Sequence, residues 1–379
     1  MPGGPAVVCR DVQCRGGGPA TPHVGANFGG QHRYTLCRFV TALCLCLLPA
    51  FSGADDVLAD PRPSERGLPT VTVVPPRHLG APQLFGVAVA GRRLYVGTLT
   101  GLAIHDGAHW ETVPSARALY AVHANSSGRV VAGGPDILVE LTHDADGQRQ
   151  LVSLLDRLPE AERAIGDVRS VHALADTFFV VTDRALIRLH GADLRVVGRW
   201  RSDPRRRGFT SGGVLYVVSQ GAVRGFTPSA APVSDAVTAR EPGDGLVTFV
   251  AAHPRAGHIV GIEGRGVFAV RDAVWTPVGQ GAGAMLARGV TDARVLESGA
   301  LALGSDAAGL VLLTPELTFD RALGRAEGLP SSHVESLAED AEGGVWVASP
   351  AQLARVDFGT PLTLIDTRLG LEGDRKSVV

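Results

Sequence analysis

The run Leu94-Tyr95-Val96-Gly97 is the first of seven short apolar stretches that each end at a small residue and precede a second apolar run. The other copies are Val130-Val131-Ala132-Gly133, Phe179-Val180-Val181-Thr182, Tyr216-Val217-Val218-Ser219, Ile259-Val260-Gly261, Leu301-Ala302-Leu303-Gly304 and Val345-Trp346-Val347-Ala348. The small residues recur at steps of 36, 49, 37, 42, 43 and 44 residues. A period of about 40 residues with several short strands per repeat is typical of β-propeller blades. We therefore predict an all-β chain, a β-propeller of about seven four-stranded blades.

The first repeat shows how one blade is assembled. Apolar strands are expected at Leu84–Ala90, Leu94–Thr98, Gly101–Asp106 and Trp110–Val113, with a turn at 91–93. Four strands of this length make one blade. Closing seven such sheets into a ring covers both faces of every blade without disulfides.

The longest step, from Gly133 to Thr182, includes the segment 151–163, where leucines recur at helical spacing. Pro159 interrupts that pattern, so we predict a loop with one or two turns. The extra length makes this connection a candidate functional insertion.

The composition excludes several classes of protein. The chain has 379 residues, 20% of them charged, and a formal net charge of −2, which is globular and near neutral. A nucleic-acid-binding protein usually carries a marked basic excess, so no nucleic-acid partner is expected. The 48 glycines and 24 prolines suit many tight turns between short strands.

All five cysteines precede the repeats, which therefore contain neither a disulfide framework nor a cysteine metal site. They are Cys9, Cys14, Cys37, Cys44 and Cys46. Cys9 and Cys14 have no matching second pair, which argues against a zinc site.

Residues 33–54 are predicted to be a secretory signal peptide. Arg33 and Arg38 supply positive charge, Phe39–Leu48 is an apolar run, and Ser52-Gly53-Ala54 offers small residues for cleavage. The apolar run is short for a membrane span. We expect an exported protein, with a buried helix or a retained anchor as the alternatives.

The flanking segments are expected to differ from the repeats. Residues 1–32 are rich in glycine and proline and precede the signal, which suggests a misassigned start or an unstructured leader. Residues 55–80 are expected to form a proline-rich lead-in, with a strand at Val71–Val74, and the propeller is expected over 81–373.

The last six residues, 374–379, do not match the rest of the chain. Lys376 is the only lysine among the 36 lysine and arginine residues of the chain. The six residues are also what a common sequencing adapter encodes. We expect an artefactual tail on a truncated reading frame, a natural tail being the alternative.

The clearest repeat runs from Gly328 to Asp357. It contains Gly328-Leu329-Pro330, then Leu337-Ala338-Glu339-Asp340, Gly343-Gly344, Val345-Trp346-Val347-Ala348-Ser349 and Leu353-Ala354-Arg355-Val356-Asp357. This blade resembles the two-component regulator propeller repeat. That repeat opens on Gly-Leu-Pro and has an apolar–Trp–apolar–Gly–Thr strand followed by a Gly-Leu strand that ends in Asp. Ala348-Ser349 replaces Gly-Thr here, and Ala351-Gln352 stands where glycine would precede Leu353.

The resemblance covers about residues 81–373 and implies a function. Such propellers are extracytoplasmic sensor regions that commonly precede a β-sandwich, a membrane helix and a histidine kinase. It therefore implies the periplasmic, or membrane-tethered, ligand-sensing input half of a two-component receptor whose output domains are missing. The expected ligand is a small molecule or glycan, and the missing C-terminal parts would support a homodimer.

The repeat residues themselves are expected to shape the blades rather than to bind a ligand. Asp before Gly suits a hairpin turn, and Trp346 would pack between blades or near a strand end. The structural motif residues are Gly97, Asp106, Gly328, Leu329, Asp340, Gly343, Trp346 and Asp357.

Catalytic signals are lacking in the sequence. The histidines are dispersed, and His105 and His109 lie on a strand and turn, where a helical metal pair is not available. No nucleophile elbow, phosphate loop or calcium loop appears. We predict no catalytic residue, metal site or cofactor, and no enzyme activity for the chain as given.

Arg205-Arg206-Arg207 is the remaining candidate for ligand binding. Three adjacent guanidinium groups would suit an anionic ligand such as an acidic sugar, whereas a solvated loop between blades is the simpler interpretation. Two further functions stay open: an exported propeller lyase or hydrolase, which needs a cluster at the central channel, and an interaction scaffold of the cell envelope.

Overall fold

The computed structural model describes residues 67–358 except 221, 236, 238–244 and 287–288. The expected leader, signal peptide and tail (1–32, 33–54 and 374–379) lie outside the described residues. The strands are β1 (Thr70–Val74), β2 (Leu84–Ala90), β3 (Arg93–Thr98), β4 (Gly101–His105), β5 (Trp110–Pro114), β6 (Ala121–Ala124), β7 (Val130–Gly134), β8 (Ile137–His143), β9 (Arg149–Ser153), β10 (Val168–Leu174), β11 (Thr177–Thr182), β12 (Ala185–His190), β13 (Asp193–Arg199), β14 (Arg207–Ser211), β15 (Val214–Ser219), β16 (Ala222–Phe226), β17 (Pro232–Val233), β18 (Val247–His253), β19 (Gly257–Ile262), β20 (Gly266–Arg271), β21 (Val274–Val278), β22 (Val290–Val295), β23 (Leu301–Ser305), β24 (Leu310–Leu313), β25 (Phe319–Leu323), β26 (Ser336–Glu339), β27 (Gly344–Ala348) and β28 (Leu353–Asp357). The short helical turns are η1 (Pro76–His78), η2 (Leu155–Arg157), η3 (Glu160–Glu162) and α2 (Gly283–Leu286).

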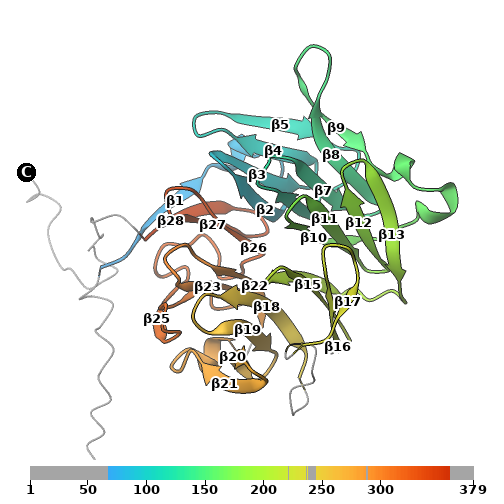
Figure 1. Cartoon of the computed structure of the whole chain (residues 1–379). Coiled ribbons are helices and arrows are strands. Elements are labelled where there is room, and N and C mark those ends of the chain that lie inside the picture. The colour runs from blue at the N-terminus through green and yellow to red at the C-terminus, as the bar shows by residue number, and fades with distance from the viewer. Residues whose placement is uncertain (1–66, 221, 236, 238–244, 287–288, 359–379) are drawn as a thin grey trace, which may run out of the picture. The chain divides into compact units, whose positions relative to one another are not determined.

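The 28 strands form seven antiparallel four-stranded sheets arranged as a ring, which is a seven-bladed β-propeller (Figure 1). Six blades take four consecutive strands, beginning with β2, β6, β10, β14, β18 and β22. The first strand of each blade contacts the first strand of the next, and β26 contacts β2. These seven inner strands therefore surround the axis of the ring. The four strands expected for the first blade are confirmed by β2 to β5.

The seventh blade joins the two ends of the described chain. Its order is β1-β28-β27-β26, and β1 pairs with β28 from Thr70 opposite Asp357 to Val74 opposite Leu353. The strand expected at Val71–Val74 is therefore a blade strand, and the boundary at residue 81 is too late. Sequence reasoning placed it there because a single strand far from its partners carries no repeat signal. Closing the ring with the N-terminal strand pairs the edge of β28 that would otherwise be exposed.

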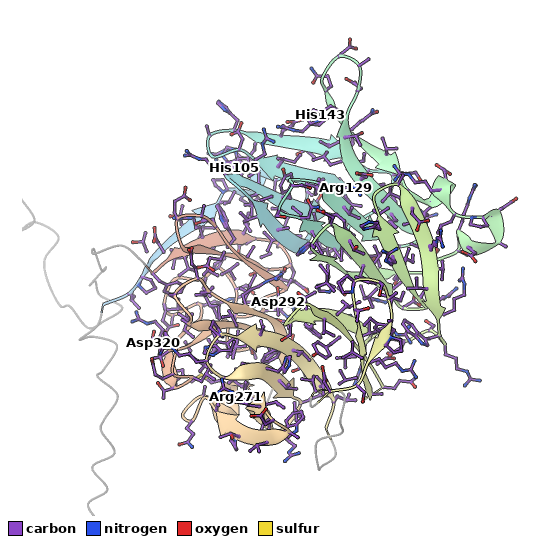
Figure 2. All side chains as sticks on the ribbon, viewed as in Figure 1. His105, Arg129, His143, Arg271, Asp292 and Asp320 are labelled. Atoms are coloured by element: carbon purple, nitrogen blue, oxygen red, sulfur yellow. The ribbon has the colours of Figure 1, made fainter. Side chains whose placement is uncertain are left out.

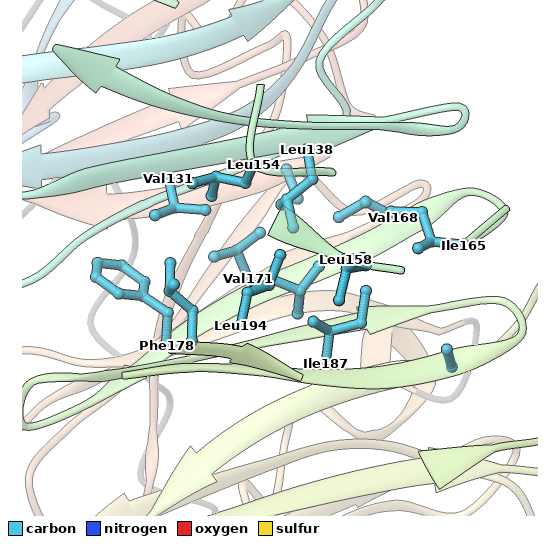
Figure 3. Close-up of a cluster of buried hydrophobic side chains, with 14 residues drawn as sticks. Val131, Leu138, Leu154, Leu158, Ile165, Val168, Val171, Phe178, Ile187 and Leu194 are labelled. Carbon is cyan, nitrogen blue, oxygen red and sulfur yellow. The ribbon is translucent and has the colours of Figure 1, made fainter. Parts of the chain in front are cut away.

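The long connection between the second and third blades packs against the hydrophobic core between these two blades. It holds η2 and η3, as expected for a loop with turns. Leu154, Leu158 and Ile165 are fully or almost fully buried, and they share one cluster with Phe178 and Ile187 (Figure 3). Burying each large aliphatic side chain contributes about 1.5–3 kcal/mol, so this segment stabilises the joint between two blades.

Asp340 organises the clearest repeat. Its Oδ1 accepts N–H groups from Glu342 and Gly344, and its Oδ2 accepts Nε1–H of Trp346 at 2.9 Å. Arg355 donates from Nε to Oδ2 at 2.6 Å and from Nη2 to Oδ1 at 3.0 Å. Burial favours the neutral acid, but these donors, above all Arg355, hold the pKa of Asp340 below its usual value.

The other motif residues also have local structural partners. A Cβ at Gly97 would overlap the carbonyl oxygen of Leu119 in the next blade, which leaves room for glycine alone. Asp106 Oδ1 accepts the N–H groups of Ala108 and His109, and Asp357 Oδ2 accepts Nη1–H of Arg355. Gly328 and Gly343 have φ of +107° and +78°, and Leu329 is buried between the sixth and seventh blades.

Candidate ligand-binding site

The seven inner strands line a central channel of about 1140 Å³. One end of it, which we call the mouth, is formed where the inner strands begin. Because strands in a blade alternate in direction, the loops between the second and third strands lie at the same end. The loop residues Gln220, Glu263 and Asp306 line the mouth in this way.

Near the start of its inner strand, each blade contributes a residue that lines the channel. We call this set the entrance ring: Phe85, Tyr120, Arg169, Arg207, Thr248, Thr291 and Glu335. In four blades the pairing of the inner strand slips at this point, between Leu84 and Val87, Val168 and Ser170, Val247 and Phe249, and Val290 and Asp292. A β-bulge of this kind bends the strand and can re-aim a side chain.

The entrance ring divides into sectors of different chemistry. The first and second blades give an aromatic pair, Phe85 and Tyr120, whose rings meet edge to face at 4.7 Å. The third and fourth give arginines, the fifth and sixth give threonines, and the seventh gives Glu335. In a ring of seven, the seventh blade lies opposite the third and fourth. The mouth is therefore cationic on one side and anionic on the other.

The cationic side contains Arg169 and Arg207 of the entrance ring, and Arg205 lines the channel beside them. Arg169 Nη2 lies 3.0 Å from Oδ2 of Asp167, but its Nε is buried and has no hydrogen-bond partner among the described residues. Among the described residues, Arg207 donates to the carbonyls of Arg206 and Pro204. Desolvation lowers the pKa of Arg207, and the positive charge of Arg169 lowers it further, whereas the nearby charge of Asp203 raises it. An arginine side chain in a protein carries its positive charge at neutral pH.

The anionic side is built around His333. Its Nε2 lies 3.1 Å from Oε1 of Glu335, and its Nδ1 lies 3.8 Å from Oδ1 of Asp306. All three side chains are partly exposed. The charge of Glu335 acts across the mouth, where it raises the pKa of Arg207 against the two opposing effects.

Deeper polar groups join the blades to one another. Ser170 Oγ accepts Gly208 N–H at 2.9 Å, and Asp292 Oδ2 accepts Leu337 N–H at 2.8 Å and the Ser336 hydroxyl at 3.2 Å. Asp292 lies toward the middle of the ring (Figure 2). These groups are occupied by hydrogen bonds between blades.

Two histidines face each other inside the channel. The rings of His123 and His172 have centroids 6.2 Å apart. Burial, with a smaller contribution from the charge of Arg294, lowers the pKa of His123 to about 4. Burial also lowers the pKa of His172 well below its usual value, so both are neutral at pH 7.

The three arginines predicted from the sequence are separated by the structure. Arg205 and Arg207 line the channel. Arg206 is 3% exposed and points away from it, donating to the carbonyls of Thr182, Asp183 and Arg201 with its guanidinium 4.8 Å from the ring of Trp200. Arg206 therefore holds two blades together and is not available to a ligand. Arg205 lies in a turn closed by the Arg206 N–H bond to the carbonyl of Asp203, and β14 begins only at Arg207, so the three side chains do not form one patch.

Sequence reasoning missed Arg169, Glu335, Asp306, His333, His123 and His172. A signal for the first two was present. In the third and seventh blades a charged residue follows an apolar one and precedes serine, as Val168-Arg169-Ser170 and Val334-Glu335-Ser336. A charge at the start of an inner strand, where apolar residues are expected, marks the channel wall.

Comparison with known proteins supports the fold and leaves the family open. No protein-family model matches the chain, and no curated protein matches its sequence. The structure is similar to the WD40 β-propeller domain of Doa1, with a TM-score of 0.59 and 12% identity, over 78% of this chain and 97% of that one.

Two further similar structures come from other functional classes. One is the extracellular domain of the putative hybrid two-component system BT3049 from B. thetaiotaomicron, with a TM-score of 0.58 and 13% identity over 76% of this chain. This chain spans 42% of that domain's length. The other is virginiamycin B lyase from Staphylococcus aureus, with a TM-score of 0.56 and 9% identity, over 76% of this chain and 99% of that one.

The described residues contain neither a metal-binding cluster nor a membrane-spanning helix. Within 67–358 and outside its gaps, no group of three or more His, Cys, Asp or Glu side chains could hold a metal ion. No helix of the same described residues is long and apolar enough to cross a bilayer.

Proposed function

We propose that the chain is the exported, ligand-sensing propeller of a bacterial signal-transduction receptor, and that it binds a small molecule at the mouth of its central channel. The observation that carries this proposal is the entrance ring. Here two arginines stand beside each other at the channel wall, where their mutual repulsion costs stability. Such a cost is typical of a binding site.

Two observations support the sensing role. The blade at Gly328–Asp357 resembles the two-component regulator propeller repeat, and extracellular domains of two-component proteins are among the structures of similar fold. In this proposal the output module and the dimer contacts belong to parts of the receptor outside this chain. The chain itself binds and does no chemistry.

The binding claim is tested by a thermal-shift screen of the full chain against small molecules and oligosaccharide fragments. At least one class should raise the melting temperature, and Arg207→Ala should abolish that rise. Arg195→Ala is the matched control, because Arg195 is 72% exposed on β13 and pairs only with Asp193. Hits that stabilise the Arg207→Ala protein equally would contradict binding at the mouth.

The export claim has its own test. Residues 1–80 are fused to an alkaline phosphatase that lacks a signal peptide and is active only outside the cytoplasm. Activity is expected for the native sequence and its loss when the apolar run Phe39–Leu48 is interrupted by two aspartates. Equal activity of both fusions would argue against the signal peptide.

One observation favours a second function, that of a propeller lyase or hydrolase. His333 is oriented by Glu335 at 3.1 Å and stands at the channel mouth, which is the arrangement of a general base. Incubating the protein with any ligand from the screen and analysing it by mass spectrometry separates the two functions. Unchanged ligand supports a sensor. A new product that His333→Ala no longer forms supports an enzyme.

A further inference from the structure

The entrance ring places opposite charges on opposite sides of one opening. Arg169 and Arg207 belong to the third and fourth blades, and Glu335 belongs to the seventh. Glu335 and Arg207 do not form an ion pair, yet their charges interact across the mouth. The space between them is open to a ligand.

Each side is incompletely neutralised by its own neighbours. On the cationic side, Asp167 contacts one nitrogen of Arg169, whereas Arg207 donates to backbone carbonyls and feels the charge of Asp203 without a direct hydrogen bond to it among the described residues. On the anionic side, Glu335 and Asp306 share the single imidazole of His333. An anionic ligand would satisfy the arginines and leave the carboxylates repelling it. A cationic ligand would do the reverse.

We propose that the mouth of the channel recognises a linear zwitterion, with a carboxylate at one end and an ammonium group at the other, such as a short peptide or an ω-amino acid. The carboxylate binds between Arg169 and Arg207, where two guanidinium groups offer charge-assisted hydrogen bonds. The ammonium group binds at Glu335 and Asp306. The inference rests on the proposed function, because it names the ligand class of the same site.

The remaining sectors of the ring suit the middle of such a ligand. Phe85 and Tyr120 offer an apolar edge beside the cationic side. Thr248 and Thr291 lie along the other arc, where the Thr291 hydroxyl is buried beside Gly304 and is not exposed to a ligand. A peptide group or methylene chain that spans the mouth would contact both arcs.

Isothermal titration calorimetry with matched probes tests the inference on the full chain. The zwitterions are β-alanine, γ-aminobutyrate, ε-aminohexanoate and glycylglycine, and hexanoate and hexylamine are the single-charge controls for ε-aminohexanoate. We expect at least one zwitterion to bind about tenfold more tightly than either control, a difference of about 1.4 kcal/mol. The best length in the series then measures the span of the mouth.

Two variants show which side of the mouth binds the ammonium end of the ligand and which side binds its carboxylate. Glu335→Gln keeps a hydrogen-bond partner for His333 and should remove the advantage of ε-aminohexanoate over hexanoate. Arg207→Ala should remove its advantage over hexylamine. Glu111→Gln is the control, because Glu111 is half-exposed on β5 and pairs with Arg149 away from the channel.

The outcomes separate this inference from the proposed function. If hexanoate binds as tightly as ε-aminohexanoate and Arg207→Ala weakens both, the zwitterion inference is wrong and ligand binding at the mouth stands. If none of the probes binds, the inference is also wrong, and the broader screen alone decides the proposed function.

Discussion

Asp340 and Trp346 are joined by a hydrogen bond of 2.9 Å from the indole Nε1 to Oδ2, and the same carboxylate receives two donors from Arg355 on the next strand. One acid thereby fixes a hairpin turn, an aromatic side chain between blades and an adjacent strand.

Asp340→Asn should destabilise the protein by about 1.5–3 kcal/mol, because it removes one of the carboxylates that pair with Arg355, leaving Asp357, and one acceptor oxygen for the donors around it. The measurement is urea unfolding followed by fluorescence. Asp193→Asn, in an exposed pair with Arg195, is the control and should change stability by no more than about 0.5 kcal/mol. Equal effects of the two substitutions would show that Asp340 has no special role.

Removal of β1 should open the ring. A chain that begins at Pro75 lacks the strand that pairs with β28 and loses the buried side chain of Val74. About four backbone hydrogen bonds at roughly 1 kcal/mol each are lost, and each kcal/mol lowers the melting temperature of a large domain by about 2–4 °C. We expect a fall of about 10 °C by calorimetry and aggregation through the exposed edge. A chain that begins at Gly67 is the control, and identical melting of the two would contradict closure by β1.

Arg206 and Arg207 should behave in opposite ways when each is replaced by alanine. Arg206→Ala removes a buried guanidinium that donates to three carbonyls, so we expect a loss of about 2–4 kcal/mol in the free energy of unfolding. Arg207→Ala relieves the repulsion from Arg169, so stability should stay unchanged or rise while ligand binding is lost. Chemical denaturation and the thermal-shift assay report the two properties separately. A large loss of stability from Arg207→Ala would show that it is a structural residue.

The channel histidines should make the protein sensitive to acid. The pKa of His123 is about 4 in the folded protein, below the ordinary value of 6.5, and that of His172 is lowered in the same direction. The unfolded chain therefore binds more protons, so their stabilisation is complete above about pH 6.5 and is lost as the pH falls toward 4. Within that window the slope is about 1.4 kcal/mol per pH unit for each histidine.

The midpoint of urea unfolding, measured between about pH 7.5 and 4.5, checks this slope. The double variant His123→Gln/His172→Gln should flatten it. His143→Gln, at the exposed end of β8 (Figure 2), should leave it unchanged. An unaltered slope in the double variant would assign the acid sensitivity to other groups.

The blades could be predicted from the sequence because each strand is a short apolar run bounded by turn residues, which is a local signal. Leu84–Ala90 and Leu94–Thr98 alternate around a turn, and the structure pairs Val89 with Leu94 across it. The small residues used to align the repeats are displaced by one position in the third and fourth blades, however. Thr182 and Ser219 are the last residues of their strands, whereas Gly97 is followed by Thr98. Leu84 faces Thr98 and Val168 faces Thr182, so Thr182 corresponds to Thr98 rather than to Gly97.

Long-range relationships could not be predicted in the same way. The pairing of Thr70 with Asp357 joins residues almost 290 positions apart, and no local pattern signals it. Likewise, Arg207 and Glu335 belong to different blades, and only the ring brings them to one opening. Arg205-Arg206-Arg207 was visible as a charged run, but the direction of each side chain depends on where β14 begins.

The most direct test of ligand binding at the channel mouth is a crystal structure of the full chain with the tightest ligand from the thermal-shift screen. We expect ligand density between Arg207 and Glu335, in contact with at least three side chains of the entrance ring. Density on the outer strands or at the opposite end of the channel, with an empty mouth, would contradict the account.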